Sequence, residues 1–128
     1  MDIERLQERI ADFTKALHQL DKAVQQPGNE FIRDCVIQRF EFAYELAGKM
    51  LKIRLEMEDI FAKTPKETLQ EALQAGFIVD GNAWSELQKN RNLTVHAYNE
   101  QLAEQIYRYI AQQAVVLFHQ LLEKAAQW

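Results

Sequence analysis

A chain of 128 residues with a formal net charge of −4 is long enough for one domain with a substantial core and too short for two. The acidic balance argues against a surface coated with basic residues for nonspecific nucleic-acid binding, although it leaves room for a local basic site. A charged start, no long apolar run and a single cysteine, Cys35, predict a cytoplasmic protein without a membrane anchor or an internal disulfide. Only four glycines and two prolines favour long helices over a sheet.

The first predicted helix ends at Pro27-Gly28-Asn29, where Asn29 is suited to cap the next helix. Its apolar residues recur at alternating spacings of three and four: Ile3, Leu6, Ile10, Phe13, Leu17, Leu20 and Val24. The second predicted helix runs from about residue 31 to residue 61 and is apolar over most of its girth. Such a helix is either central in the fold or carries a subunit interface as well as the core, and we favour the second interpretation.

The remaining elements are also predicted to be helical. Thr64-Pro65-Lys66-Glu67 is a helix start with a capping box, and the short helix that it opens stops at Gly76. Phe77-Ile78-Val79 is expected to be an apolar connector, and a further short helix carries Trp84 and Leu87. A long C-terminal helix has an apolar stripe made of Ala103, Ile106, Ile110, Ala114, Leu117, Leu121 and Ala125. We therefore predict an all-α, antiparallel up-and-down bundle of three long and two short helices in a single domain, 1–128.

The stretch from Asn90 to Asn99 carries the most plausible chemistry. Arg91 offers a two-pronged donor face for phosphate oxygens, and His96 can exchange a proton near neutral pH. If the two side chains converge, they suit cleavage of RNA without a metal: His96 as acid–base catalyst and Arg91 neutralising charge on phosphorus. Asn92 and Thr94 would orient the pair. The alternative is that Arg91 and His96 only cap helices and hydrogen-bond a connector.

The spacing of the pair constrains its geometry. Five residues place Arg91 and His96 about 140° apart around a regular helix, so the two side chains would not share a face. Either the segment is not a regular helix at Arg91, or two copies of the chain meet in a dimer and pool their residues. Both arrangements remain open from the sequence. No zinc or di-iron pattern, Gly-rich phosphate loop or nucleophile elbow is present, so no cofactor or metal is expected.

Five groups of residues, spread over nearly the whole chain, form a family pattern: residues 37–47, Thr64-Pro65-Lys66-Glu67, Gly76-Phe77-Ile78, Asp80-Gly81 with Trp84, and Arg91-Asn92-Leu93-Thr94 with His96, Tyr98 and Asn99. In these residues the chain resembles the nucleotidyltransferase substrate-binding proteins of the HEPN superfamily. The chain departs from the family pattern at two positions. Gly48 stands where a tryptophan is usual, which could open a cavity or reshape a groove, and Asn90 stands where an acidic residue often precedes the arginine.

The resemblance implies a dimerising helical bundle encoded beside a minimal nucleotidyltransferase, in a pair like a toxin–antitoxin module. It also implies that Arg91 and His96 form a ribonuclease active site, supported by Asn92, Thr94 and Asn99, which the partner silences by transferring AMP to Tyr98. The older family name implies instead a noncatalytic subunit that binds nucleotide or another substrate in a cleft lined by the Arg91 to Tyr98 segment. A third possibility is a helical scaffold. RNA or a nucleotide is thus the expected ligand, and the first interpretation is our leading prediction.

Overall fold

A computed structural model describes residues 2–128, and within them all regular structure is helical. The α-helices are α1 (Asp2–Val24), α2 (Glu30–Glu56), α3 (Pro65–Gln74), α4 (Gly81–Leu93), α5 (Glu100–Tyr109) and α6 (Val115–Ala125). A 3₁₀ turn, η1 (Thr94–His96), follows α4, and a π-helical segment, η2 (Ile110–Ala114), joins α5 to α6. Because α5, η2 and α6 form one continuous rod, the predicted all-α bundle of three long and two short helices is confirmed.

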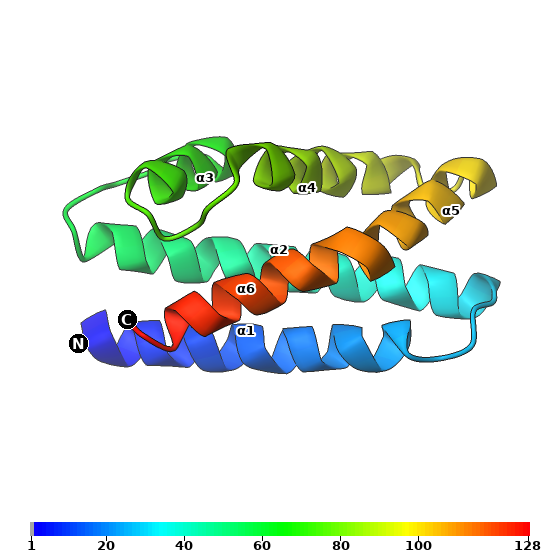
Figure 1. The fold of residues 1–128 in the computed structure, drawn as a ribbon, viewed down its shortest axis with the longest axis horizontal. Coiled ribbons are helices and arrows are strands. Elements are labelled where there is room, and N and C mark those ends of the chain that lie inside the picture. The colour runs from blue at the N-terminus through cyan, green and yellow to red at the C-terminus, as the bar shows by residue number, and fades with distance from the viewer. Residues whose placement is uncertain (1) are drawn as a thin grey trace.

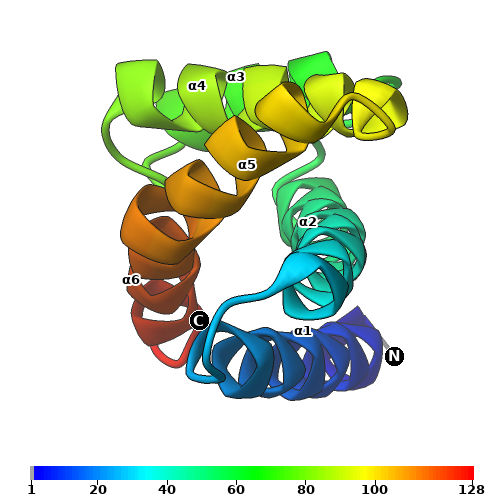
Figure 2. The same cartoon turned by 90° about the vertical axis from the view of Figure 1, so that its right-hand side faces the viewer.

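The helices run up and down along one long axis (Figure 1). The end-on view shows α3 and α4 in a layer on one side of α2, with α1 on the other side (Figure 2). The α5–α6 rod closes the remaining side and crosses the α1–α2 pair obliquely. Helix α2 contacts α1, α3, α4 and α5, so it is central in the fold, which was one of the two interpretations of its wide apolar surface. The subunit interface, which we favoured, stays a prediction. The wide apolar surface of α2 serves mostly the core of its own chain, although Phe31 and Phe42 remain exposed.

Local signals set the helix boundaries. The Asn29 side chain accepts hydrogen bonds from the amides of Phe31 and Ile32, both at 2.9 Å, and starts α2 as predicted. Thr64 accepts from the Glu67 amide at 3.1 Å while the Glu67 carboxylate accepts from the Lys63 amide at 2.9 Å, which completes the predicted capping box. Gly76, at a φ of 82°, terminates the turn after α3. These three predictions are confirmed.

The second helix is shorter than predicted. It ends at Glu56 instead of near residue 61, because the chain turns at Met57–Asp59 and Asp59 adopts a φ of 60°. The amide of Ile60 then donates to the Leu55 carbonyl oxygen at 3.0 Å and directs the chain away from the helix axis. Phe61 consequently lies in solvent and does not extend the apolar face of the helix.

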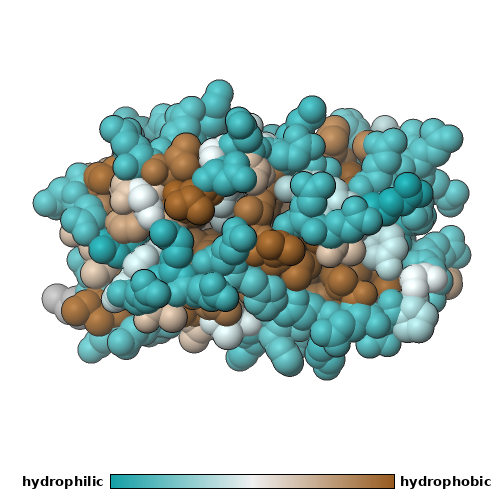
Figure 3. All heavy atoms as spheres, viewed as in Figure 1, coloured by the Kyte–Doolittle hydropathy of each residue, from teal (hydrophilic) through white to brown (hydrophobic). Residues whose placement is uncertain are grey.

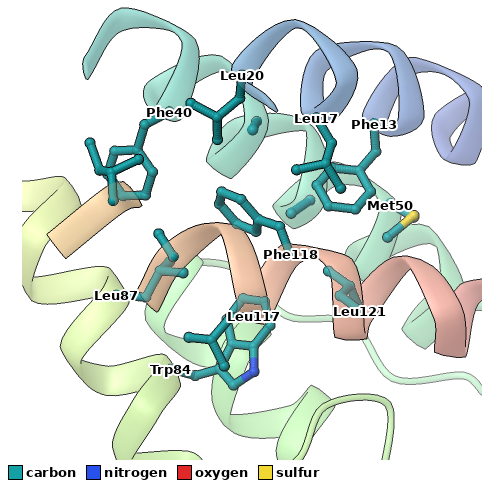
Figure 4. Close-up of a cluster of buried hydrophobic side chains, with 14 of the residues drawn as sticks. Phe13, Leu17, Leu20, Phe40, Met50, Trp84, Leu87, Leu117, Phe118 and Leu121 are labelled. Atoms are coloured by element: carbon teal, nitrogen blue, oxygen red, sulfur yellow. The ribbon is translucent and has the colours of Figure 1, made fainter. Parts of the chain in front are cut away.

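The core gathers around Phe118 of α6 (Figure 4). Its ring packs edge-on against Phe13 of α1, with centroids 5.7 Å apart, and lies 6.0 Å from the Phe40 ring of α2 and 6.4 Å from Trp84 of α4. One side chain thus joins four helices. The predicted C-terminal stripe contained Leu117 and omitted Phe118, so the sequence missed the residue at the centre of the core.

The π segment is a second feature that the sequence did not predict. The C-terminal rod was expected to be one regular α-helix, but five residues, Ile110–Ala114, are wound with the wider π repeat. Immediately before them lies Tyr109, which is 8% exposed. Its hydroxyl is fully buried and has no hydrogen-bond partner among residues 2–128. Burial raises the pKa of Tyr109, and the nearby negative charge of Glu86 raises it further.

The surface is mostly hydrophilic on the face that carries the α5–α6 rod, where apolar atoms show as separate patches between polar side chains (Figure 3). Among residues 2–128, no helix combines the length and the apolar character needed to cross a bilayer.

Candidate functional site

The Arg91-to-His96 segment is not a regular helix. Helix α4 ends at Leu93, and the following 3₁₀ turn is fixed by the Thr94 hydroxyl, which donates to the Arg91 carbonyl oxygen at 2.7 Å. The amide of Ala97 in turn donates to the Thr94 carbonyl oxygen at 3.1 Å. Arg91 itself lies in the regular helix α4, and the irregular backbone begins three residues later at Thr94.

This irregular backbone does not bring the two side chains together within one chain. The Arg91 guanidinium turns toward α2, where it pairs with the Glu45 carboxylate at 3.8 Å and lies 5.8 Å from the Tyr44 ring centroid. The His96 side chain is exposed, and its ring stands edge-on to Tyr98 with centroids 6.1 Å apart. Across residues 2–128, Arg91 and His96 share no hydrogen bond, and His96 does not border the pocket at which Arg91 lies.

The three predicted supporting residues have different surroundings. Thr94 is buried and uses its hydroxyl to hold the turn. Asn99 caps α5 by accepting from the Leu102 amide at 3.0 Å. Asn92 is exposed and borders the same pocket as Arg91. Thr94 and Asn99 thus position the backbone that carries His96 and Tyr98, whereas Asn92 is available to a ligand.

Tyr98 is the most accessible of the four tyrosines, with 84% of its surface exposed. Tyr109 is buried, and Tyr44 and Tyr107 are half-buried. The Tyr98 side chain borders a surface hollow over α2, beside Asp34 and Gln38. Its phenol oxygen is therefore open to a modifying enzyme without unfolding of the chain.

A pocket of about 630 Å³ lies between α2, α3 and α4. From the sequence, only a cavity or groove at Gly48 was expected, without its lysines or its other lining residues. Four of the eight lysines of the chain border it: Lys49, Lys52, Lys63 and Lys66. Arg91 and Asn92 lie at the same pocket, and buried apolar side chains, among them Leu51 and Trp84, line its floor. The two pairs of lysines at spacings of three, together with the unusual Gly48, are the only signals in the sequence that point to it.

Gly48 explains why the pocket is open on the α2 side. A Cβ atom built at this position would meet no other atom within 4 Å. The wall of the pocket is therefore missing a side chain, as the absence of the usual tryptophan suggested. At the same pocket, burial raises the pKa of the Tyr44 phenol, and the Gln88 side chain and the positive charge of Arg91 partly oppose the rise. Tyr44 is thus neutral at physiological pH.

In the part of the chain that the structure describes, no three histidine, cysteine, aspartate or glutamate side chains gather in a way that could hold a metal ion. The polar groups available at the site are therefore the arginine, the histidine, the exposed tyrosine, and the amide and lysine side chains around the pocket.

The sequence of residues 8–127 matches the model of the family described as nucleotidyltransferase substrate binding protein like. A curated protein of Haemophilus influenzae, named probable ribonuclease HepT, is 40% identical to this chain over 79 residues, which cover 58% of this chain and 54% of that protein. The chain thus aligns with about half the length of this relative.

Solved structures extend the similarity over the whole fold. A Haemophilus influenzae protein, described as having the fold of a substrate binding domain of a nucleotidyltransferase, is 30% identical, with a TM-score of 0.69 over 97% of this chain and 98% of that one. A tri-AMPylated HEPN toxin of Shewanella oneidensis, solved in complex with its MNT antitoxin, gives a TM-score of 0.77 over 96% and 97% of the two chains. At 17% identity, the second likeness establishes the shared fold alone.

Proposed function

Because the chain belongs to the nucleotidyltransferase substrate binding protein family of the HEPN superfamily, we propose that it is the HEPN component of a two-gene system with a small nucleotidyltransferase, and that it cleaves RNA without a metal. The observation that carries the proposal is the 3₁₀ turn after α4. It leaves the His96 side chain exposed to solvent, five residues after Arg91. The related protein named as a probable ribonuclease supports it.

The chemistry needs a base and a cation at one phosphate. His96 removes the proton of a ribose 2′-hydroxyl, and the oxygen attacks the adjacent phosphorus. The P–O5′ bond breaks, leaving a 2′,3′-cyclic phosphate, and the departing oxygen takes up a proton. Arg91 stabilises the negative charge that builds on the phosphoryl oxygens. In this reaction the Arg91 guanidinium must exchange its weak, partly exposed ion pair with Glu45 for a contact with the phosphate.

A composite site in a homodimer would bring His96 near an Arg91. The exposed surface around His96 supports such a dimer. Phe31 and Phe42 are 76% and 52% exposed, and eleven residues of helix place them within about 20° of each other on α2. Tyr98 borders the α2 residues between them, and Val95 is exposed on the neighbouring turn. A row of apolar side chains in solvent is typical of an interface.

The test of cleavage uses purified protein with a fluorescent RNA in the presence of EDTA. His96→Ala and Arg91→Ala should each lower the rate by about 10²- to 10⁴-fold while the helical content and the oligomeric state stay unchanged. His18→Ala, which removes an exposed histidine of α1, is the matched control and should cleave normally. Wild-type protein that never cleaves RNA would defeat the catalytic role, and a monomer at micromolar concentration in sedimentation would defeat the composite site.

Regulation at Tyr98 is the second part of the proposal. An AMP group joined to its phenol oxygen would place an anionic phosphate beside His96, whose ring already stands against the Tyr98 ring. That phosphate would occupy the space that RNA needs and could pair with Arg91 in a charge-assisted contact. Blocking would thus be both steric and electrostatic.

Tyr98→Phe keeps the ring and removes the acceptor oxygen, so it should leave cleavage intact and make it insensitive to the nucleotidyltransferase with ATP. Mass spectrometry of the incubated wild-type protein gives the direct measurement. An adduct on the half-buried Tyr44 or Tyr107 in place of Tyr98 would contradict this assignment.

A noncatalytic substrate-binding subunit is the second candidate. It is favoured by the Arg91 side chain, which borders the pocket between α2, α3 and α4 and pairs there with Glu45. His96 does not border this pocket. If this candidate holds, ligand binding should weaken in Arg91→Ala and stay unchanged in His96→Ala, with no cleavage by either variant or by the wild type.

A further inference from the structure

We propose that the pocket between α2, α3 and α4 binds a nucleoside phosphate, with the phosphate among the lysines at its mouth and the ring system on its apolar floor. The inference gives the substrate-binding candidate a definite site, and it does not depend on whether the chain cleaves RNA. Its basis is the charge around the pocket, the shape that Gly48 creates and the composition of the floor.

The charge argument concerns how cations are distributed over an acidic chain. Five cationic side chains border the pocket, the four lysines and Arg91, against one carboxylate, Glu45. The whole chain carries −4, so this is a local reversal of sign. Among residues 2–128, none of the four lysines has a carboxylate within ion-pair distance, whereas Arg91 holds Glu45 at 3.8 Å. Unpaired cations around one concave surface attract an anion.

The hydrogen bonds that cap α3 determine which groups at the pocket are free to bind the phosphate. The N-terminus of this helix lies at the pocket, and its positive dipole end favours an anion. The capping box already uses the amides of Lys63 and Glu67, however, and Pro65 has no amide proton. This leaves the amide of Lys66 as the free donor in the first turn of α3, so most of the phosphate contacts would come from the ammonium groups of Lys49, Lys52, Lys63 and Lys66. All four side chains belong to exposed residues, so they can move to meet a ligand.

The shape argument concerns the floor. A volume of about 630 Å³ falls within the range of about 300–1,000 Å³ that is usual for small-molecule sites. Leu51 is fully buried and Trp84 is 4% exposed, while the half-buried Tyr44 lies at the same pocket. An apolar, partly aromatic floor beneath a ring of lysines suits a ligand with one flat apolar part and one anionic part. A bare inorganic anion would leave this floor uncovered.

Gly48 makes room for the flat part. Because no atom lies within 4 Å of the position of its missing Cβ, a large side chain there would project into open space at the pocket. The chain therefore offers a matched pair of variants. Gly48→Ala adds only one methyl group at the pocket wall and favours the helix, so it should weaken binding less than the tryptophan variant. Gly48→Trp fills the space from the wall and should abolish binding.

Calorimetric titration of the full chain with ATP, adenosine and tripolyphosphate at low salt tests the proposal. ATP should bind, and adenosine and tripolyphosphate should each bind at least tenfold more weakly. The double variant Lys63→Gln/Lys66→Gln should weaken ATP binding by about tenfold. Lys15→Gln/Lys22→Gln makes the same charge change on exposed residues of α1 and is expected to bind ATP like the wild type.

His96→Ala separates this site from the ribonuclease. It removes the proposed cleavage but should leave ATP binding unchanged, because His96 does not border the pocket. Equal losses in both lysine double variants would show attraction by overall charge alone and overturn the proposal. Tripolyphosphate that binds as tightly as ATP would overturn the nucleoside assignment. If ATP does not bind and an RNA oligonucleotide binds through Lys63 and Lys66 instead, the pocket is part of an RNA-binding surface, and the proposal of a nucleoside phosphate site is refuted.

Discussion

Replacing Tyr109 with phenylalanine should stabilise the protein. The Tyr109 hydroxyl is fully buried without a hydrogen-bond partner among residues 2–128. A polar group in this position costs about 1–3 kcal/mol of the free energy of folding, because it loses its bonds to water and gains none. Tyr109→Phe removes this cost and leaves a void of only one oxygen atom, which is worth a few tenths of a kcal/mol at about 24 cal/mol per Å³.

The net gain in the free energy of unfolding should be about 1–2 kcal/mol, which raises the melting temperature by about 3–8 °C in a domain of this size. Thermal unfolding followed by circular dichroism measures it. Tyr98→Phe is the matched control, since its hydroxyl is in solvent, and it should leave the melting temperature unchanged. A melting temperature of Tyr109→Phe at or below that of the wild type would refute the reasoning and indicate that a water molecule satisfies the hydroxyl.

The same residue predicts a pH dependence. Because burial raises the pKa of Tyr109 above its ordinary value, the folded chain keeps the phenolic proton at an alkaline pH where the unfolded chain releases it. Above about pH 10 the folded state therefore binds more protons, and the free energy of unfolding falls as the pH rises. Tyr109→Phe should show a smaller alkaline loss than the wild type in urea unfolding at pH 9 and pH 11.

Three further predictions concern stability. Phe118→Ala should lower the free energy of unfolding by about 3–5 kcal/mol in urea titration, because it empties the centre of a core shared by four helices; a loss below 1 kcal/mol would contradict that central position. Asn29→Ala should cost about 1 kcal/mol through the lost cap of α2, and Asn29→Asp should restore it. Thr94→Val should cost about 1 kcal/mol and slow RNA cleavage, because it releases the turn at Arg91; unchanged cleavage would show that the turn does not position the motif.

The fold could be predicted from the sequence because its signals are local. The caps at Asn29 and Thr64 and the stop at Gly76 each act over one or two turns, and the apolar spacing of α1 repeats along that one helix. Phe118 was missed because its importance depends on contacts between helices and not on a local signal. The stripe through Leu117 and Leu121 satisfies helical spacing, and only contacts with α1, α2 and α4 show that Phe118 is the central residue.

The candidate site was predicted less completely. The sequence offers Arg91, His96 and Tyr98 as candidates, but its local pattern does not reveal the 3₁₀ turn that leaves His96 and Tyr98 exposed. Arg91 turns toward α2 because Glu45 and Tyr44 lie there, and these residues are nearly fifty positions earlier in the chain. The lysine-lined pocket likewise joins α2 and α3, so its charge becomes visible only when the helices are packed.

The π segment makes the C-terminal rod tolerant of a one-residue deletion at Ile110–Ala114. The buried positions Ala103, Ile106, Ile110, Ala114, Phe118, Leu121 and Ala125 are separated by three, four, four, four, three and four residues. Removal of one residue between Ile110 and Ala114 would restore strict alternation of three and four, which is the phase of a regular α-helix. Deletion of the exposed Gln112 should therefore keep the buried faces of α5 and α6 toward the core. Deletion of one residue within α5 or α6 would instead rotate one half of the rod by about 100° relative to the other. The wide turn is thus the place where this helix can absorb an insertion or deletion without losing register.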